Sequence, residues 1–138
     1  MWAESTNNPM EERFVKNAAV ILGHALAGWA LCAATMGIGL QLFPLLTAPI
    51  IHDISAPIFF ALISWNFFRR FRFATPAQTA AVFVLVAVFL DFFLVALAIQ
   101  KNLAMFANFL GTWIPFALIL ASTYVTGRWW EAQDVGEG

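Results

Sequence analysis

The sequence predicts an all-α integral membrane protein, a bundle of four transmembrane helices with both termini on the cytoplasmic side. The chain of 138 residues is 62% hydrophobic but only 11% charged, whereas a soluble domain carries about 25% charged residues. Four apolar runs approach the length of about 20 residues that a membrane-spanning helix needs. The cations are also distributed unevenly between the two expected membrane faces, which favours one orientation.

The membrane domain is expected over residues 18–126, after a polar N-terminal segment, 1–17, with a short interfacial helix, and before a cytoplasmic tail, 127–138. Its four spans are predicted at 18–43, 49–68, 77–99 and 109–126. The first would be about 39 Å long as a helix and should tilt or protrude, because the hydrocarbon core is only about 30 Å thick. The loops are short, so consecutive helices should be antiparallel neighbours.

Helix-capping patterns mark several expected boundaries. Asn8 precedes Pro9, and Thr75 precedes Pro76. In both places a capping side chain stands before a proline at the first helical position. Gly127 follows the last apolar run and is typical of a helix end.

The positive charges predict the orientation. The face shared by the N-terminus, the 69–75 loop and the C-terminus has six cations, and the opposite face has only Lys101. The six are Arg13, Lys16, Arg69, Arg70, Arg72 and Arg128. The positive-inside rule therefore predicts a multi-pass protein of the cell (inner) membrane with both termini cytoplasmic.

Aromatic and basic residues at this face are expected to anchor the chain in the lipid bilayer. Trp65, Trp129 and Trp130 would form the aromatic belt of the cytoplasmic interface. Arg69, Arg70 and Arg72 form a cluster smaller than the 4–8 basic residues of typical lipid head-group sites. We interpret this cluster first as a topology anchor and second as a lipid site.

The first span is rich in small residues, which mark helix contacts in membranes. Close packing against other helices is the first interpretation, and lining a path or ligand pocket is the second. The candidate packing residues are Gly23, Gly28, Cys32, Thr35 and Gly39.

Pro57 and Pro115 interrupt the second and fourth spans. Proline removes one backbone hydrogen bond inside a helix. Both are therefore predicted to kink their helices, and the freed carbonyl groups could face an ion or substrate.

Ionisable residues inside the spans are the candidate functional residues, because an ionised group in hydrocarbon is costly and needs a partner. By depth, Asp91, His52 and Asp53 belong to an outer polar layer, and His24 belongs to an inner one. Asp91 lies in the most apolar run of the chain. It is predicted either to carry a proton or cation or to join helices as a protonated hydrogen-bonding group.

Two functions follow as hypotheses. The first is a proton- or cation-linked transporter or channel protomer that works as a homo-oligomer, with the four ionisable residues along its pathway. The second is an accessory or structural subunit of a larger membrane complex, packing helices, lipid or pigment.

A single-His haem or chlorin site is a third possibility. An intrachain bis-His haem is disfavoured, because His24 and His52 differ in depth by about 16 Å. No metal-site, enzyme or nucleic-acid-binding motif occurs in the sequence.

Overall fold

The computed structural model describes residues 8–44, 47–107 and 112–137. Over these ranges the chain is helical, without strands, which confirms the predicted all-α class. The elements are α1 (Pro9–Leu42), α2 (Thr47–Arg70), α3 (Pro76–Leu90), a π-helix η1 (Asp91–Gln100), a 3-10 helix η2 (Ala104–Ala107) and α4 (Ile114–Glu137). Three stretches are long and apolar enough to cross a membrane, namely Pro9–Leu42, Thr47–Arg70 and Pro76–Ile99.

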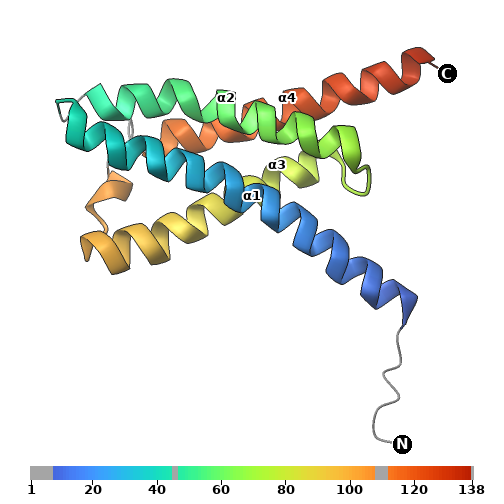
Figure 1. The fold of residues 1–138 in the computed structure, drawn as a ribbon, viewed down its shortest axis with the longest axis horizontal. Helices are drawn as coiled ribbons and strands as arrows, with labels where there is room; N and C mark the ends of the chain where they lie inside the picture. The colour runs from blue at the N-terminus through green and yellow to red at the C-terminus, as the bar shows by residue number, and fades with distance from the viewer. Residues whose placement is uncertain (1–7, 45–46, 108–111, 138) are drawn as a thin grey trace, which may run out of the picture.

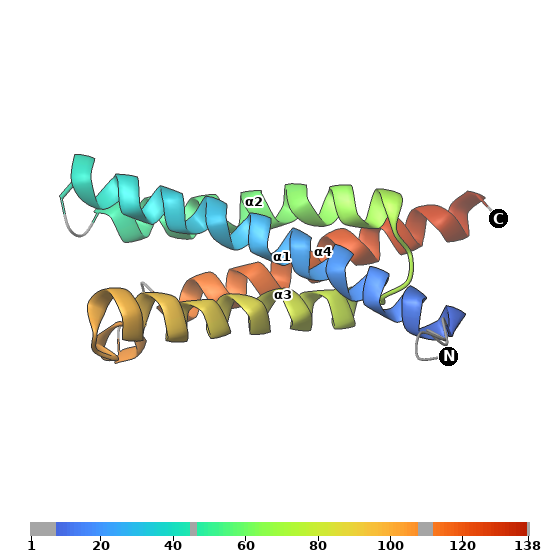
Figure 2. The ribbon, with the colours of Figure 1, turned by 60° about the horizontal axis from the view of Figure 1, so that its bottom comes forward.

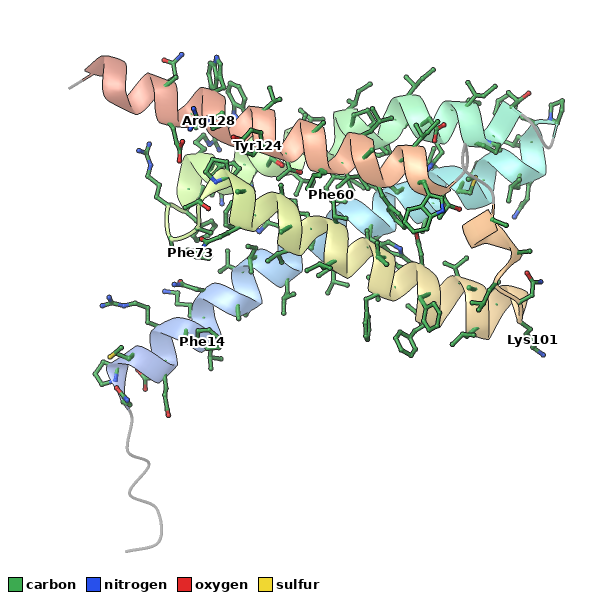
Figure 3. All side chains as sticks on the ribbon, turned by 180° about the vertical axis from the view of Figure 1, so that it is seen from behind. Phe14, Phe60, Phe73, Lys101, Tyr124 and Arg128 are labelled. Atoms are coloured by element: carbon green, nitrogen blue, oxygen red, sulfur yellow. The ribbon has the colours of Figure 1, made fainter. Side chains whose placement is uncertain are left out.

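The four α-helices form a closed ring of contacts. α1 packs on α2, α2 on α4, α4 on α3, and α3 on α1, the last contact being the least extensive. Figure 2 shows α1 and α2 in one layer and α3 and α4 in the other. The beginnings of α1 and α3 and the ends of α2 and α4 lie at one end of the bundle (Figure 1). Arg128 and Phe73 lie at this end, and Lys101 lies at the other (Figure 3).

The predicted helix caps at Asn8 and Thr75 are confirmed. Asn8 Oδ1 accepts a hydrogen bond from the Met10 amide at 3.1 Å. Thr75 and Gln78 form a reciprocal capping box, with each side chain bonded to the other residue's backbone amide at 3.1 Å. These bonds satisfy amides that a helix start leaves unpaired, so the sequence defines both starts locally.

The first helix begins in the polar N-terminal segment and runs without a break into the first predicted span. α1 is one continuous helix of 34 residues, or about 51 Å. This length exceeds the hydrocarbon thickness of about 30 Å. The N-terminal end of α1 diverges from the other helices (Figure 1), and it exposes Met10 and Phe14 there.

Gly127 does not end the fourth helix, so that prediction is wrong. α4 continues to Glu137, and Gly127 is buried within it. A Cβ atom at Gly127 would lie 2.6 Å from Pro76 Cβ and 2.8 Å from Phe68 Cζ. The glycine therefore permits a close approach of α4 to α2 and α3, a packing role that a helix-end pattern cannot reveal.

The predicted fourth span begins at residues 109–111, which lie outside the described residues. Pro115 is the second residue of α4 and follows a π-helical turn at Thr112 and Trp113. Because the start of this span lies outside the described residues, the predicted kink at Pro115 stays a prediction. Pro57, by contrast, lies inside α2, which continues through it.

Aromatic side chains fill the middle of the bundle. Phe60, Phe67 and Phe83 are fully buried. The Phe83 ring centroid lies 5.8 Å from that of Phe60 and 6.1 Å from that of Phe67, within the usual range of aromatic pairs. α2 and α3 are thus held together by interlocking rings, and the space between them is occupied.

Candidate functional site

Asp91 and Trp29 join α1 to α3 near the middle of both apolar stretches. Trp29 Nε1 donates a hydrogen bond to Asp91 Oδ1 at 2.8 Å, and both side chains are half-buried. The Asp91 amide is shared between the carbonyls of Ala87 and Val88 at the end of α3. Buried Cys32, three residues beyond Trp29 on α1, lies within electrostatic range of the Asp91 carboxyl. Asp91 thus lies at the α1–α3 contact, which is the least extensive of the four contacts between helices.

The indole partner leaves the second carboxyl oxygen of Asp91 available for a proton. An indole N–H is only a donor, so Oδ1 is the acceptor whether the carboxyl is ionised or protonated. If the carboxyl is protonated while Oδ1 accepts from Trp29, the proton belongs on Oδ2.

The backbone changes from α-helix to π-helix at Asp91. The predicted regular helix to residue 99 ends at Leu90, and η1 continues to Gln100 with the wider π-helical turn. Lys101 ends it in the left-handed conformation at φ 58°, and the Asn102 amide bonds to the Ala96 carbonyl at 2.9 Å. π-helical segments are rare and often accompany functional sites. Asp91 is therefore placed where the helix changes its geometry.

His52 and Asp53 form a second polar group, closer to the loop end of α2. His52 Nδ1 and Asp53 Oδ1 are 4.0 Å apart, too far for a hydrogen bond. Both atoms are buried without a hydrogen-bond partner, and each side chain is 12% exposed. Such atoms are costly in an apolar environment unless they find a partner.

The structure separates this group from Asp91. Gly28 faces Phe60 and Gly39 faces Ala48 across the α1–α2 contact. These two contacts set the register of the antiparallel helices, so His52 lies level with a point on α1 about six residues beyond Trp29. That point is about 10 Å farther along the axis of α1. No hydrogen bond or ion pair joins the two groups in the described chain. The predicted outer layer is thus two groups at different depths.

His24 is held by hydrogen bonds at both ring nitrogens. Nδ1 lies 2.8 Å from the Val20 carbonyl, so Nδ1 carries the proton, and Nε2 accepts from Asn66 Nδ2 at 3.0 Å. The ring makes T-shaped contacts with Phe67 and Phe71, with centroids 5.3 and 5.9 Å away. A haem or chlorin metal would have to displace one of these bonds. The geometry is that of a satisfied packing residue joining α1 to α2.

The small residues of α1 fall on different sides of the helix. Gly28, Cys32 and Gly39 are buried, and a Cβ at Gly28 would lie 2.7 Å from the Phe60 ring. Thr35 donates to its own helix, at the Leu31 carbonyl, at 2.8 Å. Gly23 is exposed, and a Cβ there would meet nothing within 4 Å. Gly23 thus makes no close helix contact within the described chain, and its role in helix packing stays a prediction.

The tryptophans of the basic end form one cluster. Trp65 stacks on Trp129 with centroids 5.0 Å apart, and Trp130 contacts both rings at 5.3 Å. Arg69 and Arg70 form the exposed last turn of α2. Arg72 borders a cavity beside Trp130. Cations and tryptophans thus gather at one end, as interfacial anchors do.

Trp29 is the partner that sequence reasoning missed. In a sequence, a tryptophan inside a membrane span cannot be told from an ordinary apolar residue. No spacing rule links it to an acid 62 positions away. The available signal was chemical, because a buried Trp N–H normally finds an acceptor. Asp91 was one of the few acceptors of the third span.

The fold and composition define a class, that of small helical membrane proteins. Comparison with protein-family models, with curated proteins and with solved structures finds no match for this chain. A more specific assignment has to come from the geometry of its own residues.

Removing the indole donor tests the Asp91–Trp29 bond. In a double-mutant cycle of Trp29→Phe and Asp91→Ala, each of which removes the bond, we expect a coupling free energy of about 1 kcal/mol, typical of interhelical hydrogen bonds in membranes. Reversible unfolding in mixed micelles measures it. Additive effects of the two substitutions would mean that the bond contributes nothing to stability.

Proposed function

We propose that the protein is a protomer of a proton- or cation-linked membrane transporter or channel, with Asp91 as the group that carries the charge. One observation carries the proposal. The acid sits half-buried in the most apolar stretch of the chain, anchored by Trp29 through one oxygen, at the start of a π-helix. An intramembrane carboxyl held in this way can change protonation without losing its position.

The filled core favours a path along the side of the bundle. Phe60, Phe67 and Phe83 occupy the middle, so an ion would pass the α1–α3 crossing, where Asp91 lies. A half-buried acid on one protomer needs a second surface to shield it from lipid. We therefore propose a homo-oligomer in which a neighbouring copy completes the path and His52 and Asp53 form a separate station nearer the outer end.

The proposed topology has four spans in the cell (inner) membrane, with both termini cytoplasmic. In this topology α4 supplies the fourth span. Its apolar part is followed by Arg128 and Glu131 within the same helix, which lowers its mean hydropathy. The gathering of Arg13, Lys16, Arg69, Arg70, Arg72 and Arg128 on the terminal side supports this orientation.

Cysteine labelling tests the orientation. In a Cys32→Ser background, we expect a cysteine at Ala132 to be shielded from an impermeant thiol reagent in intact cells and a cysteine at Ala104 to react. Both positions are exposed on the protein, so access depends on the side of the membrane. Lysed cells provide the control, where both must react. The reverse pattern in intact cells would invert the topology.

The alternative function is an accessory subunit of a larger membrane complex. The same filled core favours it, because buried aromatic rings occupy the middle of the described bundle. Asp91 would then join α1 to α3 through Trp29 as a structural hydrogen bond, and the exposed apolar faces would pack partner helices, lipid or pigment.

Flux measurements separate the two functions. Purified protein in proteoliposomes is expected to pass protons or a monovalent cation faster than protein-free vesicles, and native mass spectrometry in mild detergent is expected to show a homo-oligomer. Flux equal to that of empty vesicles, together with co-purifying partner subunits or a pigment absorption band, would support the accessory function instead.

A further inference from the structure

A groove of about 520 Å³ lies at the basic end of the bundle, between the start of α1 and the loop that follows α2. α1 diverges from the other helices at this end (Figure 1). Phe71 and Phe73 of the loop form one wall of the groove. The other wall is a stripe of α1 whose members recur at helical spacing, namely Pro9, Arg13, Lys16, Asn17 and Val20, with Glu12 beside them.

Aromatic packing holds the apolar wall in place. The ring centroids of Phe71 and Phe73 lie 5.8 and 5.4 Å from that of Phe67, which is fully buried. The Phe71 amide also bonds to the Phe67 carbonyl at 2.7 Å. Phe73 nevertheless remains 38% exposed. The loop therefore presents a fixed apolar surface to the groove.

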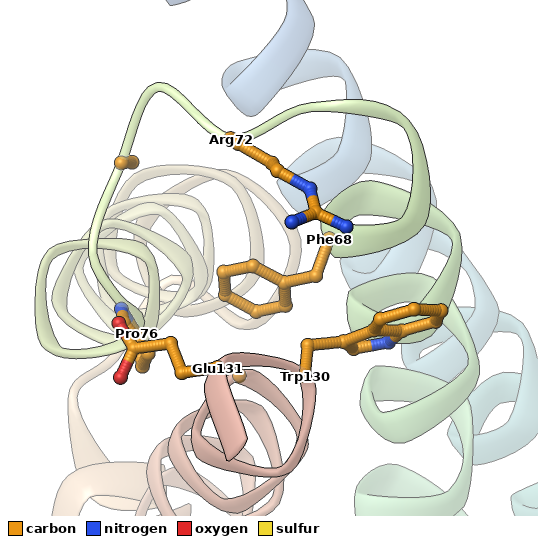
Figure 4. Close-up of a pocket in the computed structure, with 7 residues that line it drawn as sticks. Phe68, Arg72, Pro76, Trp130 and Glu131 are labelled. Carbon is orange, nitrogen blue, oxygen red and sulfur yellow. The ribbon is translucent and has the colours of Figure 1, made fainter. Parts of the chain in front are cut away.

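The cations of the groove have no partner in the described chain. Arg13 and Lys16 are three residues apart and lie on one face of α1, where both are exposed. Neither forms an ion pair or a side-chain hydrogen bond among the described residues. Arg72 does not contribute, because its side chain extends over Phe68 into the cavity beside α4 (Figure 4). Two cations against the single carboxylate of Glu12 leave the groove with a net charge of +1.

We propose that this groove binds an anionic phospholipid, with its phosphate at Arg13 and Lys16 and an acyl chain against Phe71 and Phe73. Guanidinium and ammonium groups are the usual ligands of a phosphate. The tryptophan cluster lies at the same end of the bundle and marks the depth of lipid head groups. A soluble anion would leave the apolar wall uncovered, and the net positive charge disfavours a head group that adds an ammonium. Binding here does not depend on the role of Asp91.

Lipid titration of the full-length protein, followed by native mass spectrometry, tests the site. With identical acyl chains, we expect phosphatidylglycerol to bind about fivefold more tightly than phosphatidylcholine, as suits one net charge at a membrane surface. Lys16→Gln should remove most of this preference, and Glu12→Gln should increase it by a similar factor. Arg69→Gln is the matched control and should leave the preference unchanged, because Arg69 is exposed at the same end but does not line the groove.

Glycerophosphoglycerol, the same head group without acyl chains, separates a lipid site from a site for a soluble anion. We expect it to bind about tenfold more weakly than phosphatidylglycerol or worse, because it cannot cover the apolar wall. Binding as tight as that of the lipid would identify a soluble anion as the ligand and overturn the proposal. Equal affinity for the two lipids, or equal effects of Lys16→Gln and Arg69→Gln, would also overturn it.

Discussion

Gly28→Leu is expected to destabilise the bundle by about 3 kcal/mol, near the upper end of the usual cost of overpacking. A Cβ at position 28 alone would lie 2.7 Å from two atoms of the Phe60 ring. Phe60 is fully buried and packs against Phe83, so it cannot turn aside without disturbing the α2–α3 contact. The substitution should therefore separate α1 from α2 and loosen the aromatic core.

Gly37→Leu is the matched control on the same helix. Its Cβ would meet nothing within 4 Å, and the position is exposed. We expect its effect to stay within about 0.5 kcal/mol, as for most surface substitutions. Thermal unfolding in detergent, followed by circular dichroism, measures both variants. Equal midpoints for Gly28→Leu and Gly37→Leu would show that the α1–α2 contact does not depend on Gly28.

The helix class and several helix starts were predictable because local chemistry determines them. Runs of apolar residues define helices in a membrane, and the capping side chains of Asn8 and Thr75 define where two of them begin. The far ends were less predictable. Glycine is common at helix ends, and Gly127 was predicted to be one. The helix α4 continues past it, and the glycine instead allows the close contact with Pro76 and Phe68. A tertiary contact of this kind leaves no local signal.

The individual residues of the candidate site were predictable from the sequence, but their contacts with one another were not. Depth counting placed His24 in an inner polar layer, separate from Asp91, and the structure gives it Asn66 as a hydrogen-bond partner. The same counting grouped Asp91 with His52, although helix register separates them by about 10 Å. The pairing of Asp91 with Trp29 depends on how α1 crosses α3. Rotation and crossing of helices follow from packing, which periodicity within a single span does not encode.

Asp91→Asn is expected to abolish transport while the protein still inserts and assembles. An amide has nearly the same shape as the carboxyl, and its oxygen can still accept the hydrogen bond from Trp29. It cannot release or bind a proton, and it cannot balance a cation. The substitution therefore removes the proposed chemistry and retains the helix contact.

Asp91→Glu provides the complementary variant. It keeps a protonatable carboxyl but moves it by one methylene relative to Trp29, so we expect partial activity with a shifted pH dependence. If Asp91 had a purely structural role, Asp91→Asn would retain more activity than Asp91→Glu, because the amide fits the existing contact better than the longer acid does.

Proton or cation flux into proteoliposomes across a pH series, compared between wild type and Asp91→Asn at equal amounts of assembled protein, tests the proposed role of Asp91 most directly. We predict that flux through Asp91→Asn falls to the level of protein-free vesicles while oligomer size stays unchanged. Flux through Asp91→Asn equal to that of the wild type would contradict a transport role for this carboxyl.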